Sequence, residues 1–289
     1  MKTPKKLLAL ALSLILVFAL ASCSKNDGAQ SGGGDQDGVV YRTLDEIKES
    51  GNINIGVFSD KSPFGYVDEN GEYQGYDVYF ANRIGEDLGV DVTFVSTEAA
   101  NRVEYLETGK VDIILANFTV TAERAESVDF ALPYMIVYLG AVSPDSDVVT
   151  SLDDLGNGDS VIVISGTTAE TYLIENYPDL TLQKYDTYAN AKSALDNGNG
   201  VVWVNDNTEV MAFAIENEGY TVGIPTLGSQ DTIAPAVSKG NSTLLEWIND
   251  EIEGLAAEQF FHADYEATLA DTYGLEFEES LVVEGGVLD

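Results

Sequence analysis

The chain has 289 residues, of which 45% are hydrophobic and 10% aromatic, a composition typical of globular proteins rather than disordered or fibrous ones. Its 14 Lys and Arg stand against 49 Asp and Glu, which gives a formal net charge of −35. Because so acidic a surface repels phosphate groups, this balance argues against binding to nucleic acid and against electrostatic binding to anionic membranes.

The first 22 residues have the pattern of a secretory signal peptide, since lysines precede the apolar run from Leu7 to Leu20. The run ends in "LASC", which resembles the lipobox of bacterial lipoproteins. Cys23, the one cysteine of the chain, is therefore either a leftover buried thiol or a lipidation site, and its place directly after the signal core favours lipidation. A single cysteine excludes intramolecular disulfides.

Residues 24–38 contain no large apolar residue and are rich in Gly, Ser, Asp and Gln, which predicts a flexible tether. The folded part is then expected over residues 39–289.

Apolar residues in this folded part follow a strand and helix alternation. Strands are predicted at residues 53–58, 90–96 and 111–118, with helices at 77–88 and 100–109. After an apolar segment at 133–143 the pattern resumes, with strands at 160–165, 181–185 and 201–204 and helices at 167–177, 188–198 and 207–219. One more strand within 231–238 and a closing helical region follow. The alternation predicts mostly parallel sheets with helices on both faces.

Two arrangements fit this periodicity. If the last strand and helices return to the first unit, the chain crosses twice, near residues 138–143 and 229–235, and a cleft lies between two lobes joined by a hinge. Two serial domains would show the same pattern.

Ligands of open α/β sheets bind beyond the carboxyl ends of the strands, so the residues that follow each apolar run are candidates. In "ANFTVTAERAESV" the run is followed by Thr121, a possible helix N-cap, and by Arg124. An arginine in a first helical turn is unfavourable for the helix dipole but can bind a carboxylate through two parallel hydrogen bonds. The alternative is a surface arginine paired with Glu123 or Glu126.

Two further candidates lie in the second unit. In "SGTTAETY", Thr167 and Glu170 fit a capping box, which an ordinary capped helix explains fully. In "VVWVNDNTEV", Asp206 stands two residues past the predicted strand, either as an N-cap or as a carboxylate for an ammonium group. A cation for a carboxylate together with an anion for an ammonium group describes a site for an amino-acid zwitterion.

Four segments, "GVFSDKSPFGYVDENGEYQGYDVYFANRI", "LETGKVDIILANFTVTAERAESVDFALPY", "SGTTAETYL" and "DTIAPAVSKG", resemble the extracellular solute-binding proteins of bacterial polar amino-acid ABC transporters. The resemblance implies a two-lobed periplasmic-binding-protein fold of type II, α/β in class, with lobe 1 at 39–139 and 232–289 and lobe 2 at 140–231. It assigns the ligand carboxylate to Arg124 and the ammonium group to Asp206. The assisting positions it implies are Asn117, Thr119, Thr167 and Thr168.

A finer resemblance to the cysteine-binding branch lies in "EAANRVEYL", "NDNT", "EQFFHADYEATL" and "VVEGG". Many members of the family place an aromatic ring near position 99, where this chain has Ala99 and Ala100, so a long basic ligand is not expected. Phe64, Tyr66 and Tyr134 are either substitutes for that ring or core residues. Lys61 is a possible contact for a ligand carboxylate or thiolate, or an exposed surface lysine.

The expected function is that of a receptor, lipid-anchored on the outer face of the bacterial cytoplasmic membrane, that captures a small polar amino acid, with cysteine favoured. The permease and its ATPase would be separate chains. The sequence has no second apolar run long enough to span a membrane, and it has no G-x-x-x-x-G-K-[ST] motif for ATP. We expect a monomer without metal or cofactor. The rivals are a dehydratase-type enzyme on the same fold, for which His262 is the only histidine, and a ligand-sensing module.

Overall fold

The computed structural model describes residues 40–156 and 158–288, all within one compact unit, Asp35–Asp289. The predicted signal peptide, Cys23 and the tether lie outside the described residues. Within them no helix is long and apolar enough to cross a membrane.

A first five-stranded sheet has the order β5-β1-β6-β13-β7. Its strands are β1 (Asn52–Val57), β5 (Asp91–Ser96), β6 (Ile113–Ile114), β7 (Val128–Phe130) and β13 (Ala236–Ser238). β1 pairs in parallel with β5 and β6, whereas β13 pairs antiparallel with both β6 and β7. The segment after residue 231 therefore adds a strand to the sheet that begins the fold, and the sheet is mixed rather than wholly parallel.

The helices associated with this sheet come from both ends of the chain. They are α1 (Leu44–Ser50), α2 (Tyr76–Leu88), α3 (Arg102–Glu107), α4 (Arg124–Ser127), α8 (Ser242–Leu255), α9 (Phe260–Thr268), α10 (Ala270–Tyr273) and α11 (Glu278–Leu281). A small sheet of β2 (Asp60–Lys61), β3 (Gly65–Val67) and β4 (Tyr73–Gln74) follows β1. We call these two sheets and eight helices lobe 1.

A second five-stranded sheet has the order β10-β9-β11-β8-β12. Its elements are β8 (Met135–Pro144), β9 (Ser160–Ile164), β10 (Thr181–Tyr185), β11 (Val202–Asp206) and β12 (Tyr220–Ile233), with α5 (Thr168–Asn176), α6 (Tyr188–Asp196) and α7 (Asn207–Glu216). β9, β10 and β11 are parallel, and β8 and β12 are antiparallel additions. We call this sheet and its three helices lobe 2. The 3₁₀ segments are η1 (Ala99–Asn101), η2 (Leu152–Asp154), η3 (Ala256–Glu258), η4 (Leu275–Phe277) and η5 (Glu284–Gly286).

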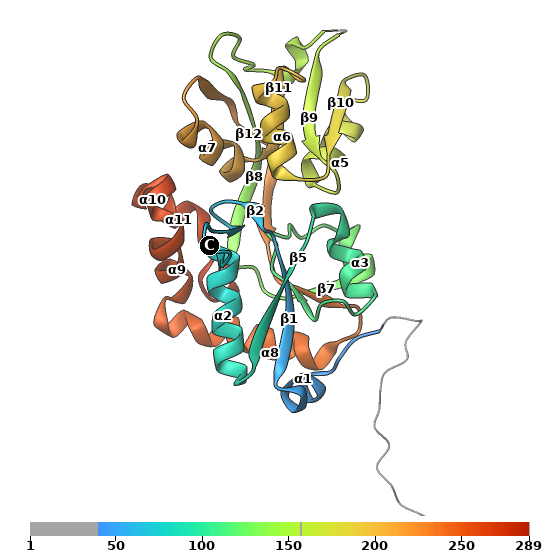
Figure 1. Ribbon diagram of the computed structural model, residues 1–289, viewed down its shortest axis with the longest axis vertical. Coiled ribbons are helices and arrows are strands. Elements are labelled where there is room, and N and C mark those ends of the chain that lie inside the picture. Colours follow the sequence, from blue (N-terminus) through green and yellow to red (C-terminus); the bar gives the residue numbers. More distant parts are fainter. Residues whose placement is uncertain (1–39, 157, 289) are drawn as a thin grey trace, which may run out of the picture. The chain divides into compact units, whose positions relative to one another are not determined.

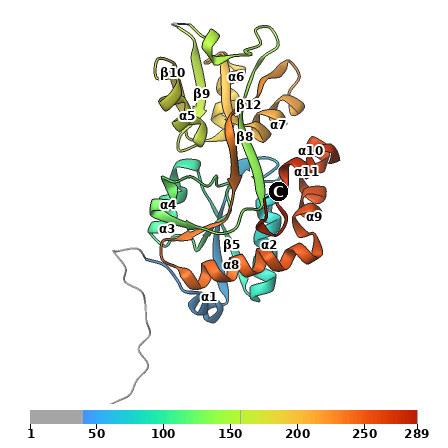
Figure 2. The same ribbon diagram turned by 180° about the vertical axis from the view of Figure 1, so that it is seen from behind.

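The two lobes are connected by β8 and β12, which pair from Met135 and Ile233 to Pro144 and Tyr220 with register shifts between. Figures 1 and 2 show these two strands running side by side from one sheet to the other. The predicted lobe boundaries at residues 139 and 231 both fall inside these strands. Because each strand runs from one lobe into the other, the pairing does not define a boundary residue, and the two positions stay predictions. The long strand β12 was not predicted, because Pro225 and the run of exposed residues from Gly228 to Gln230 interrupt its apolar pattern.

Several predicted elements differ in length from the observed ones, and three of these carry candidate site residues. The strand expected at 111–118 is only two residues long, because pairing ends after Ile114. The helix after Thr121 has four residues. The strand expected to end at residue 204 continues to Asp206, so Asp206 is its last residue rather than two beyond it.

Asp77 in the first turn of α2 is buried, and it joins two distant segments of lobe 1. Its carboxylate accepts a hydrogen bond from the Tyr134 hydroxyl at 2.5 Å and one from the backbone N–H of Asn117 at 2.8 Å. Burial raises the pKa of Asp77 to about 7, although both hydrogen bonds oppose the shift.

The consequence for stability has a definite sign. The unfolded chain releases this proton near pH 3.8 and the folded protein near pH 7, so the stabilisation is present at low pH and is lost as the pH rises through 7. Asp77→Asn should remove this dependence. We expect its free energy of unfolding to fall less steeply with rising pH than that of the wild type, by up to about 1.4 kcal/mol per pH unit.

Denaturant unfolding at several pH values between about 4.5 and 7.5 measures this difference. Asp179→Asn, exposed in a turn, is the matched control and should leave the slope unchanged. Parallel curves for the wild type and Asp77→Asn would contradict the assignment.

Candidate ligand-binding site

The lobe 1 side of the site is built by the segment that leaves β6. Asn117 adopts a left-handed conformation, with φ of 44°, which asparagine tolerates better than most residues. Its N–H is held by Asp77, and Thr119 then forms a bridge with Ile233 of β12. Asn117 and Thr119 are both buried. These contacts fix the path of the chain up to Arg124.

Arg124 is the first residue of α4, and the Thr121 hydroxyl accepts its backbone N–H at 3.2 Å. The guanidinium donates to the carbonyl oxygens of Thr119, at 2.7 Å, and of Gly166 in lobe 2, at 2.9 Å. It lies 4.7 Å from the centroid of the Phe118 ring. Burial, with the nearby charge of Arg102, lowers the pKa of Arg124 to about 9.

Arg102 is a second arginine at this place, and the sequence analysis missed it. Its side chain is 3% exposed and donates to the carbonyl oxygens of Ala99, Ala116, Asn117 and Gly166. Burial lowers its pKa. The available signal was its spacing, since Arg102 stands one helical turn before the buried Leu106 and therefore on the inner face of α3.

Gly166 of lobe 2 is thus the shared acceptor for both arginines. Its φ is +77°, and a Cβ there would lie 2.5 Å from Cα of Ala100 in lobe 1. Only glycine allows both this conformation and this approach. Ala100 is therefore part of a close contact between the lobes.

Thr167 and Thr168 begin α5 and have different surroundings. The buried Thr167 hydroxyl donates to Ile164 and accepts the N–H of Glu170, so it caps the helix. The Glu170 carboxylate accepts from the N–H of Gly166 rather than of Thr167, so half of the predicted capping box forms. Thr168 lines a cavity.

Asp206 ends β11 and occupies the N-cap position of α7, but its side chain makes no capping hydrogen bond. Its Oδ2 instead accepts from the Lys61 ammonium of lobe 1 at 2.9 Å, and Lys61 also donates to Oδ1 of Asn117 at 2.5 Å. The alternative of an exposed Lys61 is wrong, since its side chain is fully buried. Burial alone would lower the pKa of Lys61, but the Asp206 carboxylate raises it.

Phe64 and Tyr134 both belong to the hydrophobic core of lobe 1. The Tyr134 ring stacks on Phe261 and its hydroxyl donates to Asp77. Phe64 is within reach of the Lys61 ammonium, 5.3 Å from its ring centroid. Neither ring lines the cavity next to Arg124. His262 lies on α9, where its Nδ1 is 2.9 Å from Glu284.

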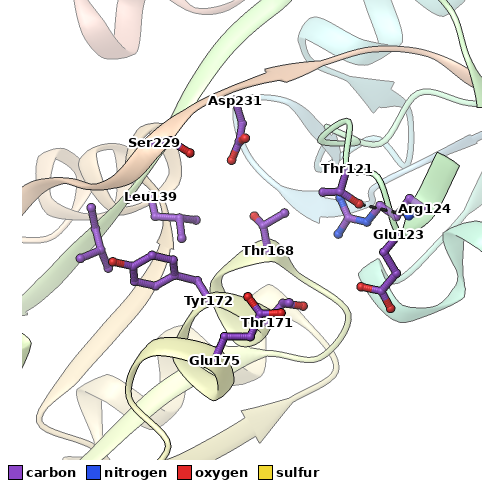
Figure 3. Close-up of a pocket in the computed structure, with 12 residues that line it drawn as sticks. Thr121, Glu123, Arg124, Leu139, Thr168, Thr171, Tyr172, Glu175, Ser229 and Asp231 are labelled. Carbon is purple, nitrogen blue, oxygen red and sulfur yellow. Dashed lines mark hydrogen bonds between the residues drawn. The ribbon is translucent and has the colours of Figure 1, made fainter.

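A cavity of about 200 Å³ opens beside Arg124, between segments of both lobes. Figure 3 shows Arg124, Thr168 and Asp231 facing the same space from three different segments. Burial and the charge of Asp206 raise the pKa of Asp231. The residues lining the cavity are Thr121, Glu123, Arg124, Leu139, Thr168, Thr171, Tyr172, Glu175, Leu227, Gly228, Ser229 and Asp231.

This arrangement offers a carboxylate-binding cation and hydroxyl groups at the cavity, whereas the buried ion pair of Lys61 and Asp206 is not part of the cavity lining. Within residues 40–156 and 158–288, no group of three or more His, Cys, Asp or Glu side chains could hold a metal ion. The Arg124 guanidinium and the threonine hydroxyl groups of the cavity are suited to binding a small polar solute.

Comparisons with known proteins find relatives that cover most of the chain. The chain is 30% identical over 261 residues to the ABC transporter glutamine-binding protein GlnH of Bacillus subtilis, covering 88% of this chain and 93% of that protein. A cysteine-binding protein structure from Campylobacter jejuni matches with 46% identity and a TM-score of 0.81, covering 83% of this chain and 98% of that one. The solute receptor for L-cysteine of Neisseria gonorrhoeae matches with 48% identity and a TM-score of 0.82, covering 84% and 100%.

A family model matches residues 53–267, which is most of the described chain. The resemblance inferred from the sequence is thereby confirmed, as is the two-lobed α/β fold that it implied. The chain belongs to the bacterial extracellular solute-binding proteins, family 3.

Proposed function

We propose that this protein is the amino-acid receptor of an ABC transporter, binds its ligand between the two lobes, and delivers it to a permease. The observation that carries the proposal is the environment of Arg124. Its guanidinium is partly buried, yet its hydrogen-bond partners among the described residues are backbone carbonyl oxygens and no carboxylate.

Removing a cation partly from water without an anionic partner has a cost, and a carboxylate ligand would reduce it. A guanidinium has five N–H donors, and the hydrogen bonds to Thr119 and Gly166 leave donors for a ligand. The α-carboxylate of an amino acid is assigned to this position, with Thr168 beside it in the cavity.

The α-ammonium group is assigned to Asp206. Its Oδ2 is paired with Lys61, and a carboxylate can accept several hydrogen bonds, so the remaining acceptor capacity is available to a ligand. The supporting roles proposed for Asn117, Thr119 and Thr167 are to hold the backbone around these two charged groups. Phe64 and Tyr134 would act only through the core that supports the site.

Cysteine is the favoured ligand. The two receptors for cysteine share 46% and 48% of their residues with this chain, compared with 30% for the glutamine-binding relative. Ala99 and Ala100 leave no aromatic ring at a position that Gly166 approaches closely. A small side chain suits that constriction.

Closure of the lobes about β8 and β12 would enclose the ligand, and the closed form would dock on a permease whose ATPase is a further separate chain. The receptor would act as a monomer held by a lipid on Cys23 at the outer face of the bacterial cytoplasmic membrane. No catalytic step is proposed.

A thermal-shift screen of residues 24–289 against the amino acids, followed by titration calorimetry, tests the proposal. A ligand that binds only the folded state adds about 2.7 kcal/mol of stability at 100 times its Kd, so it should stand out. Stabilisation by cysteine or another small polar amino acid is expected. The absence of binding by any amino acid, after refolding to remove carried-over ligand, or turnover of a prephenate-like substrate, would contradict it.

Arg124→Ala should abolish amino-acid binding, with at least a hundredfold loss in affinity, because it removes the partner of the ligand carboxylate. Calorimetry measures the loss, and a retained unfolding transition shows that the fold persists. Arg83→Ala is the matched control, since Arg83 on α2 pairs with Asp87 of the same helix and with Glu258 of η3 at the surface. Equal affinities for Arg124→Ala and Arg83→Ala would refute the carboxylate assignment.

Asp206→Asn should weaken amino acids far more than their deaminated analogues, because only the former have an ammonium group. Titrations with L-cysteine and 3-mercaptopropionate give the two ratios. Asp179→Asn serves as the control. If both ligands weaken equally, Asp206 does not bind the ammonium group.

Cys23→Ser should move the protein from the membrane fraction to the soluble fraction of the producing bacterium, since the lipid would be lost. Fractionation followed by immunodetection measures the distribution. Continued association of the variant with membranes would argue against lipidation at Cys23.

A further inference from the structure

Lys61 contacts one carboxylate and three aromatic rings that would otherwise attract a positively charged ligand side chain. Its ammonium pairs with Asp206 and is surrounded by three aromatic rings, at 5.6 Å from the centroid of Phe58, 5.3 Å from Phe64 and 4.9 Å from Tyr188. Carboxylates and aromatic faces are the two kinds of group that bind organic cations in proteins. Here the protein's own lysine binds to both.

The aromatic ring of Phe118 also contacts cations of the protein. The guanidinium carbons of Arg102 and Arg124 lie 4.5 Å and 4.7 Å from the centroid of Phe118. Arg102 also lies 5.6 Å from the Phe58 ring, which is thus shared with Lys61. Three cations of lobe 1 therefore occupy the four rings.

We propose that Lys61 is a specificity-determining residue that makes the site reject amino acids with cationic side chains. This inference rests on the proposed function and names its ligand class: amino acids whose side chains are neutral or anionic. A second ammonium or guanidinium group would meet like charge from Lys61 and from both arginines. The rings of Phe58, Phe64, Phe118 and Tyr188 already contact these cations, which leaves Tyr172 as the ring at the cavity that such a group could reach.

Acidic residues at the cavity do not reverse this selection. Glu123 and Glu175 line its rim but are exposed, so solvent screens their attraction for a cation. Asp231 is partly buried on β12 and lies within the field of Arg124, which lowers its pKa against the larger effect of burial. Glu209 is fully buried and is 3.1 Å from Lys192. Lys61 and its partner Asp206 are both almost completely buried, and there the interaction of charges is strongest.

The test compares dissociation constants for L-cysteine, L-serine, L-lysine and L-arginine by titration calorimetry on residues 24–289. The wild type should bind its best neutral amino acid at least a hundredfold more tightly than lysine or arginine. In Lys61→Gln the same ratio should fall at least tenfold, because the variant frees Asp206 and the three rings. Lys61→Arg, which keeps the charge, should retain the wild-type ratio.

Lys48→Gln is the matched control, since Lys48 is exposed at the end of α1, and it should leave all four constants unchanged. A folded Lys61→Gln that keeps the wild-type ratio would overturn the inference while leaving the proposed function intact. A wild type that binds lysine or arginine as tightly as cysteine would also overturn the inference, and this measurement needs no variant. A wild type that binds none of the amino acids would instead refute the proposed function.

Discussion

Burial of positive charge at the boundary between the lobes is the constraint on which this structure depends. In a chain with a formal net charge of −35, Lys61 and Arg102 are at most 3% exposed, and Arg124 lies beside them. Removing an ammonium or guanidinium group from water costs several kcal/mol unless partners replace the solvent. The partners here are one carboxylate, the side-chain oxygen of Asn117, a set of backbone carbonyl oxygens and four aromatic rings. Most of these belong to lobe 1, and the remainder must come from lobe 2.

Lobe 2 supplies its partners for these cations near the starts of three helices. The Gly166 carbonyl precedes α5, and Asp206 precedes α7. At the start of α6 the N–H of Ala189 donates to the Asp60 carboxylate of lobe 1, and Tyr188 packs edge-on against Phe58. Because β9, β10 and β11 are parallel, their carboxyl ends and the helices that follow meet at one edge of the sheet. The topology of lobe 2 thus brings two acceptors, the Gly166 carbonyl and the Asp206 carboxylate, and the Tyr188 ring to the cations of lobe 1.

One chain of hydrogen bonds connects this boundary to the start of β8. The Tyr134 hydroxyl and the Asn117 N–H both donate to Asp77, and the Asn117 side chain accepts from Lys61, which also donates to Asp206. Tyr134 directly precedes β8, one of the two strands that connect the lobes. The charged groups proposed for the ligand and the strand about which the lobes would move therefore share partners. A change at Asp206 alters the environment of Lys61 first and of Asp77 through Asn117.

The sequence by itself determined the class of fold and the residue types at the candidate site. Alternating periodicity gave most helices and the parallel strands, because each depends on local spacing of apolar residues. The motif around Arg124 and the family resemblance predicted an arginine and an aspartate as binding residues. Sequence spacing could not determine partners that are distant along the chain: the pairing of Lys61 with Asp206, separated by 145 residues, or the contact of Arg102 with Gly166, separated by 64. Only the tertiary structure decided these, since a buried cation is favourable only where folding brings an acceptor to it.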